Sequence, residues 1–199
     1  LILNLSVFPM NFEDFKKYRW FYTSSKKLVV GGKSSLQNDQ LLYRLKASEK
    51  DYLVMHTESP GSPFCVILSE IKNVTEVDIK ECAIFTACFS QLWKKKKEKA
   101  PVHIFRLSQV NKDKTMKEGT WGLHGKIQKI YVPLNLTVKR QKGIFRAVPP
   151  TEKDKIIITF GKVDKKDMLA KLELELNENF SEQEVLSALP SGPFKVARK

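Results

Sequence analysis

The chain has 199 residues and a formal net charge of +13, and 42% of its residues are hydrophobic. This composition is typical of a globular protein with one main domain, and no apolar run approaches the roughly 18 residues of a membrane span. Cys65, Cys82 and Cys88 have no CxxC spacing, so they predict neither a disulfide framework nor a zinc site and favour a reducing cytoplasm. Cys82 and Cys88 are expected to pack in the core rather than act as nucleophiles.

The first nine residues, LILNLSVFP, are apolar but lack the positive flank and the small-residue cleavage site of a secretory signal. Met10 is therefore a candidate start of the protein. Residues 1–11 are expected to form a poorly ordered N-terminal segment.

Strands are predicted near Arg19–Ser24 and Leu28–Val30, followed by a helix near Ser34–Leu45. Gly31 and Gly32 form the turn between strand and helix. A Gly-rich turn at a helix start often binds phosphate, because glycine lets backbone N–H groups approach an anion. Neither GxGxxG nor GxxxxGK[ST] spacing is present, so a simple tight turn is the alternative that the turn alone favours.

A hairpin is predicted across the turn ESPGS, where the alternating strand Asp51–Thr57 meets the apolar stretch Pro63–Leu68. The next element is predicted to be the longest helix, running from Thr75 through Trp93. It opens with a variant of the capping box, since Asp78 follows Thr75 by three residues, and its apolar residues recur on one face.

The remaining elements complete the predicted fold class. Further strands are predicted at Val102–Val110, Thr120–Leu123, Ile127–Leu136 and Lys155–Phe160. Two short helices are predicted near Asp164–Leu176 and Ser181–Leu189. The sequence therefore predicts an α+β fold with a mixed or largely antiparallel sheet, a long helix packed on it and a small C-terminal helical extension.

The positive charge is concentrated in the middle of the chain. Residues 1–93 carry 11 Lys/Arg against 10 Asp/Glu, residues 94–146 carry 15 against 3, and residues 147–199 carry 9 against 9. Such a concentration indicates a polyanionic partner, because cations along a phosphate backbone release condensed counterions. The alternative is a solvated basic face, and the run Lys94–Lys99 by itself is also compatible with the exposed end of a helix.

Aromatic residues lie between the central cations, with Trp121, Tyr131 and Phe145 beside lysines and arginines. This pattern suits nucleic acid, since phosphates take the charge and unpaired bases stack on aromatic rings. The candidate RNA-binding residues from this region are Lys94, Lys95, Lys96, Lys97, Lys112, Lys114, Trp121, Lys126, Lys129, Lys139 and Arg140.

A series of short motifs occurs in one order between residues 18 and 136. They are Trp20-Phe21 ahead of SSKKLVVGGK, Gln37-Asn38, DYLVMHTESPGSP, Ser90-x-x-Trp93, QVNK and EGTWGLHGK. The series resembles the NFACT-R domain of the NFACT proteins of ribosome quality control and of related stand-alone proteins. The positions that match the family motifs are Gly31, Gly32, Gln37, Asn38, His56, Gly61, Gly119 and Gly125.

Two departures from the family pattern affect individual contacts. Thr57 and Glu58 replace the Ala-Asp pair that usually follows the motif histidine, and His124 stands where the family commonly has arginine. The resemblance implies a nucleic-acid-binding module, which in the large family members is attached to domains that engage tRNA and the large ribosomal subunit. In that context Lys33 and His124 join the candidate RNA-binding residues.

The family context leaves the roles of several motif residues open. The turn at Gly31, Gly32 and Lys33 is interpreted either as an RNA-backbone contact or as a structural turn. Gln37 and Asn38 are expected to hydrogen-bond the backbone of that turn, with a base edge as the alternative. Lone histidines on strands, such as His56, are more often structural than catalytic, and no metal-ligand spacing accompanies it.

Residues 12–150 are expected to form the NFACT-R-like domain, and residues 151–199 a C-terminal extension that packs on it or binds a protein partner. The predicted function is a cytoplasmic, non-catalytic RNA-binding module of translation, acting in tRNA- or ribosome-associated quality control without cofactor or metal. Its expected partners are tRNA or rRNA, the ribosome or another RNA-processing protein, and no membrane. The alternatives are an RNA-processing or RNA-modifying enzyme, whose catalytic residues the sequence does not show, and a scaffold that binds DNA or an acidic protein.

Overall fold

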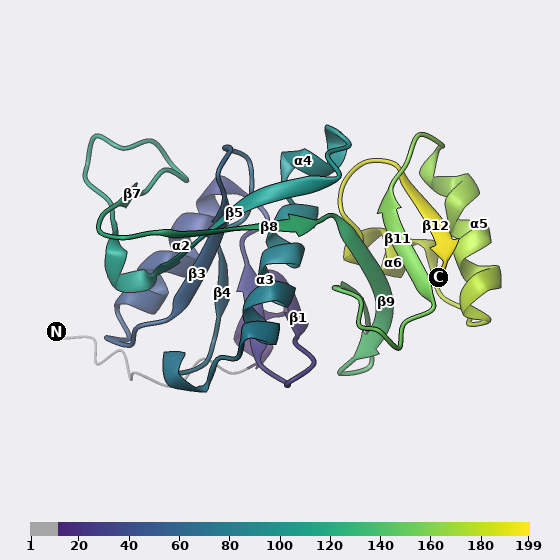
Figure 1. Ribbon diagram of the computed structural model, residues 1–199, viewed down its shortest axis with the longest axis horizontal. Helices are drawn as coiled ribbons and strands as arrows, with labels where there is room; N and C mark the ends of the chain where they lie inside the picture. Colours follow the sequence, from purple (N-terminus) through teal and green to yellow (C-terminus); the bar gives the residue numbers. More distant parts are fainter. Residues whose placement is uncertain (1–11) are drawn as a thin grey trace, which may run out of the picture.

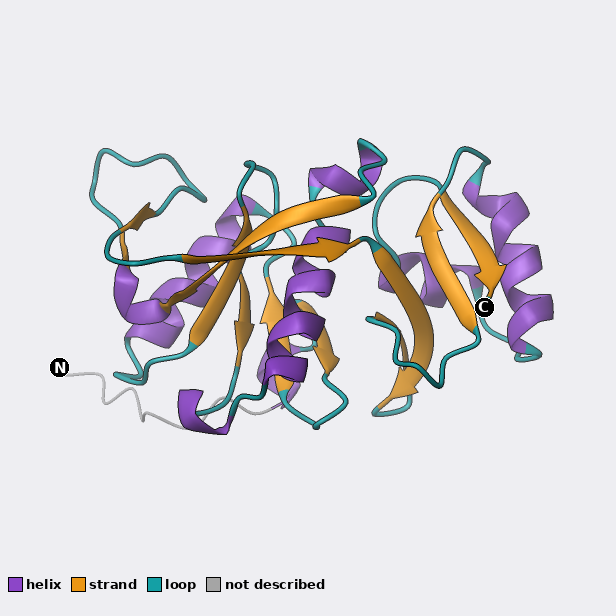
Figure 2. Cartoon of the chain, viewed as in Figure 1, coloured by secondary structure: helices purple, strands orange, loops and turns teal. Residues whose placement is uncertain are grey.

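The computed structural model describes residues 12–199, so the expectations about Met10 and segment 1–11 lie outside the described residues. Over the described residues the fold is α+β, as predicted. Two antiparallel sheets lie side by side with helices packed against them (Figure 1, Figure 2). The antiparallel pairing is thus divided between two main sheets.

The larger sheet has six strands in the order β1-β2-β4-β3-β5-β8, and every neighbouring pair is antiparallel. Its strands are β1 (Arg19–Tyr22), β2 (Leu28–Gly31), β3 (Leu53–Thr57), β4 (Cys65–Ile67), β5 (Lys99–Arg106) and β8 (Gln128–Pro133). The hairpin predicted across ESPGS is confirmed, because Val54 of β3 pairs with Val66 of β4.

Two predicted strands of this region are shorter than expected. The strand predicted at Val102–Val110 is β5, which ends at Arg106 because the chain then enters a 3-10 helix at Leu107–Gln109. The strand predicted at Thr120–Leu123 contains only β7 (Gly122–Leu123), which pairs with β6 (Val110–Asn111) in a small separate ladder. A long irregular loop, residues 112–121, lies between these two short strands.

Alternation of side chains gives the larger sheet two apolar faces, each covered by a helix. The cluster beneath α2 (Ser35–Lys46) includes Trp20, Val30, Val54, Val66, Leu41 and Leu45. The cluster beneath α3 (Glu76–Cys88) includes Phe21, Val29, Met55, Cys65 and Phe85. Successive residues such as Trp20 and Phe21 point to opposite faces, so the sheet is buried on both sides and reads as runs of apolar residues.

The predicted capping box at the start of α3 is present. Thr75 Oγ1 accepts the N–H of Asp78 at 3.2 Å, and the Asp78 carboxylate accepts the N–H of Thr75 at 2.9 Å. Most side chains in the second half of α3 are buried, because the helix packs against both sheets (Figure 1). The expectation of a single apolar face is therefore corrected.

The long predicted helix is also divided into two. α3 ends at Cys88, and a single turn, α4 (Gln91–Lys94), follows after Ser90. Ser90 Oγ accepts the N–H of Leu92 at 3.1 Å, so this serine caps a new helix rather than continuing the old one. The lysine run thus lies at the end of α4 and in the turn that follows it.

The second sheet has four antiparallel strands in the order β10-β9-β11-β12. They are β9 (Asn135–Gln141), β10 (Ile144–Val148), β11 (Ile156–Phe160) and β12 (Phe194–Arg198). The single strand predicted at Ile127–Leu136 is wrong, because the chain leaves the first sheet at Pro133 and enters the second at Asn135. No strand is predicted at β10 or β12. The predicted boundary between the domain and its C-terminal extension, at residue 150, falls between β10 and β11 of this one sheet.

Two helices pack against the second sheet, and both were predicted. They are α5 (Lys165–Leu176) and α6 (Glu182–Ala188), drawn at the C-terminal end of the molecule in Figure 1. Short helical turns at Phe12–Phe15 (α1) and Ile71–Asn73 complete the helical elements of the described residues.

The three cysteines are buried, which confirms the predicted core packing of Cys82 and Cys88. Burial raises the pKa of Cys65 to about 12 and raises the pKa values of Cys82 and Cys88 well above their ordinary value. None of them is therefore an activated thiolate. Within residues 12–199, no helix is both long and apolar enough to cross a membrane.

Candidate nucleic-acid interface

The turn between β2 and α2 is held by side chains of the helix that follows it. Ser34 Oγ accepts the N–H of Gln37 at 3.2 Å, and Gln37 Oε1 accepts the N–H of Lys33 at 3.0 Å. Gln37 therefore satisfies the backbone of the turn, as expected. Gly32 is required by space, because a Cβ at this position would lie 2.2 Å from Asn38 Oδ1.

Asn38 is buried under the turn and connects α2 to the first sheet. Its Oδ1 accepts the N–H of Phe64 at 3.1 Å, so the expectation that it bonds the turn itself is corrected. Gly31 is also fixed by packing, since a Cβ there would lie 2.7 Å from Cys65 Sγ. Both glycines thus have a structural role, while the start of the helix remains at the surface.

A polar cleft of about 260 Å³ lies beside this turn. Its wall includes Arg19 of β1, Lys33 of the turn, Gln91 of α4 and Ser191, which precedes β12. The Arg19 guanidinium stacks on Phe89, with its carbon 4.6 Å from the ring centroid. Residues of both sheet regions therefore meet at this cleft.

A second arginine reaches this region from β10. Arg146 is only 8% exposed, and its Nε donates a hydrogen bond of 3.2 Å to the carbonyl oxygen of Trp20. Its guanidinium carbon lies 4.7 Å from the centroid of the Trp20 ring. Burial and the neighbouring Arg19 lower the pKa of Arg146 to about 10. Burial, Arg19 and Arg146 together lower the pKa of Lys33.

Two more lysines stand at the rim of the cleft. A Cβ added at Gly192 would lie 3.2 Å from the side chain of Lys94, which places Lys94 next to the loop that carries Ser191. Lys165, the first residue of α5, donates to the carbonyl oxygen of Pro190 at 3.3 Å. Burial and then the charge of Lys94 lower the pKa of Lys165.

These five cations form one positive cluster, which we call the cationic cleft. Arg19 and Lys33 line the cleft. The other three members lie beside its wall: Arg146 contacts Trp20, the neighbour of Arg19, and Lys94 and Lys165 lie next to the loop of residues 190–192 that carries Ser191. Within residues 12–199, none of the five forms an ion pair with a carboxylate. Mutual repulsion without a compensating acid favours the binding of an anion.

The loop of residues 112–121 is anchored to α2 by Asp39. The Asp39 carboxylate accepts hydrogen bonds from Lys112 Nζ at 2.6 Å, Trp121 Nε1 at 2.7 Å and the N–H of Gly119 at 3.1 Å. Burial by itself raises the pKa of this carboxyl, but the three donors outweigh burial and hold the pKa below its ordinary value. Gly119 has a φ of 76° and packs on Ser35, which also lines the cleft.

The anchor changes the roles expected for two candidate RNA-binding residues. Trp121 is 8% exposed, and its ring centroid lies 5.0 Å from that of Tyr43, so the indole is a packed side chain and does not offer a free face for base stacking. Lys112 has a side chain that is 8% exposed and paired with Asp39, so it neutralises an internal carboxylate and not a phosphate.

Other candidate cations are paired at the surface. Lys129 lies 2.8 Å from Glu58, Lys139 lies 2.8 Å from Asp154, and Arg140 contacts both Glu178 and Glu184. The exposed candidates without a carboxylate partner among the described residues are Lys33, Lys94, Lys95, Lys96, Lys97, Lys114 and Lys126. The structure therefore divides the basic central segment into a paired and an unpaired set.

The motif histidine His56 lies on β3 with its ring on Phe64, at a centroid distance of 4.5 Å. Its Nδ1 donates to the carbonyl oxygen of Thr57 at 2.6 Å, and burial lowers its pKa, so the ring stays neutral near pH 7. His103 stands opposite His56 on β5, a neighbour that sequence spacing did not indicate. His103 Nε2 lies 3.6 Å from Glu58. Among the described residues, no group of three His, Cys, Asp or Glu side chains is placed to hold a metal.

The other motif residues near the cleft stabilise turns. Gly61 has a φ of 92° and would place a Cβ 2.6 Å from Gln91, so it allows α4 to approach the β3–β4 turn. Gln109 Nε2 donates at 3.0 Å to the carbonyl oxygens of both His124 and Lys126. Gly125, with a φ of 79°, makes the turn between them. The side chain of His124 is exposed.

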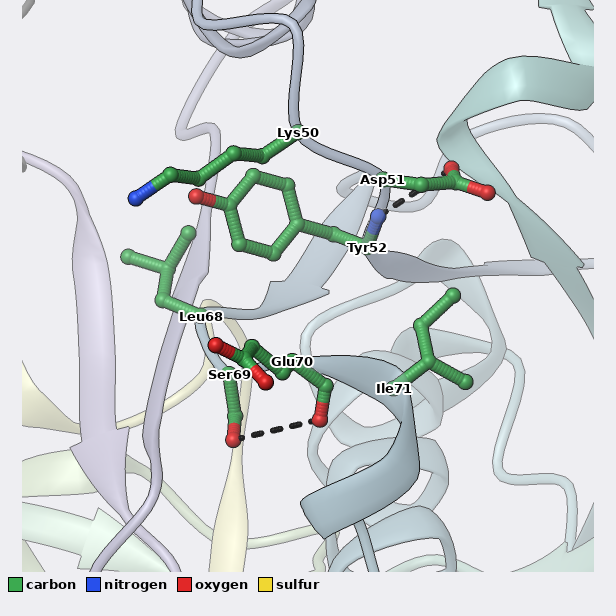
Figure 3. A pocket seen from close by; sticks show the side chains of 7 residues that line it. All are labelled: Lys50, Asp51, Tyr52, Leu68, Ser69, Glu70 and Ile71. Carbon is green, nitrogen blue, oxygen red and sulfur yellow. Dashed lines mark hydrogen bonds between the residues drawn. The ribbon is translucent and has the colours of Figure 1, made fainter.

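A larger hollow of about 480 Å³ lies at the opposite end of β3 and does not suit a binding site (Figure 3). Lys50 and Glu70 contribute charges of both signs to its wall. The Asp51 carboxylate accepts hydrogen bonds from the N–H groups of Tyr52 and Ser108. It is therefore committed to the backbone around it.

Arg19, Asp39, Arg146 and Lys165 are not among the candidate residues predicted from the sequence. Asp39 directly follows the Gln37-Asn38 motif, and this adjacency was the one available signal. The arginines give no such signal, because their grouping depends on the approach of β10 to β1.

Comparison with known proteins agrees with this architecture. A family model described as "NFACT protein RNA binding domain" matches residues 17–125. The chain is 32% identical over 80 residues to the archaeal Rqc2 homolog aRqcH of Methanocaldococcus jannaschii, which covers 40% of this chain and only 12% of that protein. The solved C-terminal part of the fibronectin/fibrinogen-binding protein from Streptococcus suis has a similar fold, with a TM-score of 0.52 and 20% identity over 58% of this chain and 45% of that one. Since the family match spans more than half of the chain, the protein belongs to the NFACT RNA-binding domain family.

Proposed function

We propose that this member of the NFACT RNA-binding domain family binds RNA through the cationic cleft and the exposed lysines next to it. We further propose that it acts in translation, in ribosome quality control, with tRNA or rRNA as its ligand. The family description and the similarity to an Rqc2 homolog support this assignment. The match covers only 12% of the length of the archaeal Rqc2 homolog, so the proposal concerns binding and not the whole activity of that protein.

The observation that carries the proposal is that exposed cations without carboxylate partners among the described residues lie in the cleft and on two sides of it. Lys94 to Lys97 lie on and after α4, whose Gln91 lines the cleft. On the other side, the loop that carries Lys114 packs through Gly119 on Ser35. In Figure 1 α4 and this loop both lie along the upper edge of the molecule. A polyanion that follows this surface meets cations over its whole length.

We propose a binding module rather than an enzyme. An RNA-processing enzyme would need a convergent acid–base pair, and the best geometric candidates are His56 and His103 on neighbouring strands. However, His56 Nδ1 already donates to Thr57, and its ring is half-buried against Phe64. These contacts support a structural histidine. We also propose that the protein is cytoplasmic, as its free buried cysteines favour.

The test compares unpaired with paired cations at equal change of charge. Lys94→Ala, Lys95→Ala and Lys97→Ala are combined in one variant, and Lys96 is kept because its φ of 55° disfavours alanine. The control variant combines Lys129→Ala, Lys139→Ala and Arg140→Ala, whose side chains pair with carboxylates. Affinity for tRNA and for single-stranded RNA is measured by fluorescence anisotropy between about 50 and 200 mM salt.

The first variant should bind unrelated RNAs more weakly and should lower the slope of log affinity against log salt by about two to three. The control should keep most of the wild-type slope. If wild-type protein binds no RNA, or if its affinity does not depend on salt, the proposed function is wrong. Crosslinking in cells followed by sequencing of the bound RNA then identifies the RNA species.

A further inference from the structure

We infer that the cationic cleft is a phosphate site, in which Arg19 and Lys33 contact one phosphate group of the bound RNA and Arg146, beside the wall of the cleft, adds its positive charge. The inference rests on the proposed function for the identity of the ligand. Arg146 lies on β10, and Ser191 precedes β12, so both lie outside the family match at residues 17–125. The second sheet thus completes a site whose other half belongs to the family domain.

The three cations approach the cleft from different elements. Arg19 comes from the first residue of β1, Lys33 from the turn before α2, and Arg146 from the middle of β10. A phosphate group is tetrahedral and accepts hydrogen bonds in several directions, which suits donors that converge from separate strands.

Both arginines are held in place by aromatic rings. Arg19 stacks on Phe89, and Arg146 stacks on Trp20 and donates its Nε to the Trp20 carbonyl oxygen. Arg146 is more than nine-tenths buried, and its one hydrogen bond within the described part of the chain uses Nε. Because the stacking fixes the guanidinium planes, little side-chain entropy is lost when an anion binds.

The start of α2 adds backbone donors to the same cleft. α2 has 12 residues, and Ser34 at its N-cap bonds the N–H of Gln37. The N–H groups of Ser35 and Leu36 donate to no acceptor among the described residues. N–H groups in the first turn of a helix point out of its end, and the helix dipole favours negative charge there. The arginines and the helix start are independent features that favour the same ligand.

The pKa values of the cleft cations in the protein without ligand also favour an anion. Burial and the charge of neighbouring arginines lower the pKa values of Lys33 and Arg146. Both the burial of these cations and the positive charge of their neighbours therefore disfavour the charged forms in the free protein. A bound phosphate reverses the sign of the local field and relieves this repulsion.

The first experiment uses inorganic phosphate as the probe and the melting temperature as the readout. The melting temperature of the full chain is measured in phosphate and in chloride at equal pH and ionic strength. Lys33→Gln and Arg146→Gln remove cleft cations, and Arg140→Gln is the matched control because Arg140 is paired with Glu178 and Glu184. Lys33 is exposed, so its variant remains informative if Arg146→Gln does not fold.

We expect phosphate to raise the melting temperature of the wild type and of Arg140→Gln, and to have no specific effect on the two cleft variants. Phosphate should also shift the backbone amide NMR signals of Ser35 and Leu36. An equal response of all variants, or no specific response of the wild type, overturns the phosphate site. This experiment does not depend on RNA binding, so it separates failure of the site from failure of the proposed function.

The second experiment identifies the source of the phosphate. Oligonucleotides of one sequence are compared with a 5′-phosphate, with a 3′-phosphate, with hydroxyl ends and as a closed circle. Lys33→Gln and Arg146→Gln should each lose about tenfold in affinity. A loss confined to one phosphorylated end assigns a terminal monoester, and an equal loss on all four RNAs assigns a backbone diester. Wild-type affinity in both variants overturns the inference even if the wild type binds RNA.

Discussion

The anchor between α2 and the loop of residues 112–121 gives the sharpest test of the structure. Asp39→Asn keeps the shape of the side chain but removes its charge. The ammonium of Lys112, whose side chain is 8% exposed and lies 2.6 Å from the carboxylate, then loses its counter-ion in a buried position. Breaking a buried ion pair in this way costs roughly 3–5 kcal/mol of folding free energy.

A double-mutant cycle isolates the ion pair from the other contacts of Asp39. Lys112→Met removes the ammonium and keeps most of the packing, and the Trp121 and Gly119 N–H donors still serve the carboxylate. We therefore expect Lys112→Met to cost less than Asp39→Asn. The double variant should be more stable than the sum of the two single costs predicts, by at least about 1.5 kcal/mol.

The assay is urea unfolding monitored by tryptophan fluorescence, with m-values checked for two-state behaviour. Asp113→Asn is the matched control, because this acid lies in the same loop but only bonds the exposed Thr115. It should cost less than about 1 kcal/mol. If Asp39→Asn costs no more than Asp113→Asn, or if the cycle is additive, the buried anchor does not exist.

The pKa of the Asp39 carboxyl predicts that the stability of the protein depends on pH. This pKa is lower in the folded protein than in the unfolded chain, because Lys112, Gly119 and Trp121 outweigh burial. The folded state then binds fewer protons than the unfolded state in this range. The contribution of this carboxyl to stability is therefore fully present above about pH 4 and is lost as the pH falls further. Asp39→Asn should flatten this part of the stability curve.

Three further variants test the roles assigned to single residues. Trp121→Ala should cost roughly 3–5 kcal/mol in urea unfolding, because the indole is buried. At temperatures at which this variant is still folded, it should bind RNA as well as the wild type does. Gly32→Ala should destabilise far more than Gly143→Ala, since its Cβ would lie 2.2 Å from Asn38 Oδ1 and nothing lies within 4 Å of the Gly143 position; equal midpoints would contradict the close packing. Burial lowers the pKa of His56, so stability should fall as pH drops below about 6.5, and His56→Gln should reduce that fall between pH 7.5 and 5.5 in matched urea titrations.

Features that depend on neighbouring residues were predictable from the sequence. The cap at Ser34, the capping box at Thr75 and Asp78, and the β3–β4 hairpin each involve groups a few residues apart. Their chemistry is therefore complete within a short window of sequence. The missed hairpin β9–β10 turns at Lys142 and Gly143, both with positive φ, and lysine is an uncommon choice for such a turn.

The contacts that organise the candidate site are separated widely in the chain. Asp39 and Lys112 are 73 residues apart, and Trp20 and Arg146 are 126 residues apart. No local spacing connects such pairs, because they meet only when the loop docks on α2 and the second sheet docks on the first. For the same reason a count of basic residues could not separate Lys112, which neutralises an internal acid, from Lys94, which has no carboxylate partner in the described part of the chain.

The cost of burying the charge of Arg146 explains why the number of basic residues alone does not locate the proposed interface. Burial and the neighbouring Arg19 lower the pKa of Arg146 to about 10, and at about 1.4 kcal/mol for each pH unit the buried charge costs the fold roughly 3 kcal/mol. An uncharged side chain of similar size at this position of β10 would avoid that cost and keep the contact with Trp20. The surface lysines that pair with carboxylates cost the fold little and offer little net charge to a ligand. A cation that destabilises the free protein is useful only when an anion neutralises it. We therefore propose that the attraction for RNA is strongest at the junction of the two sheets rather than along the most basic stretch of sequence.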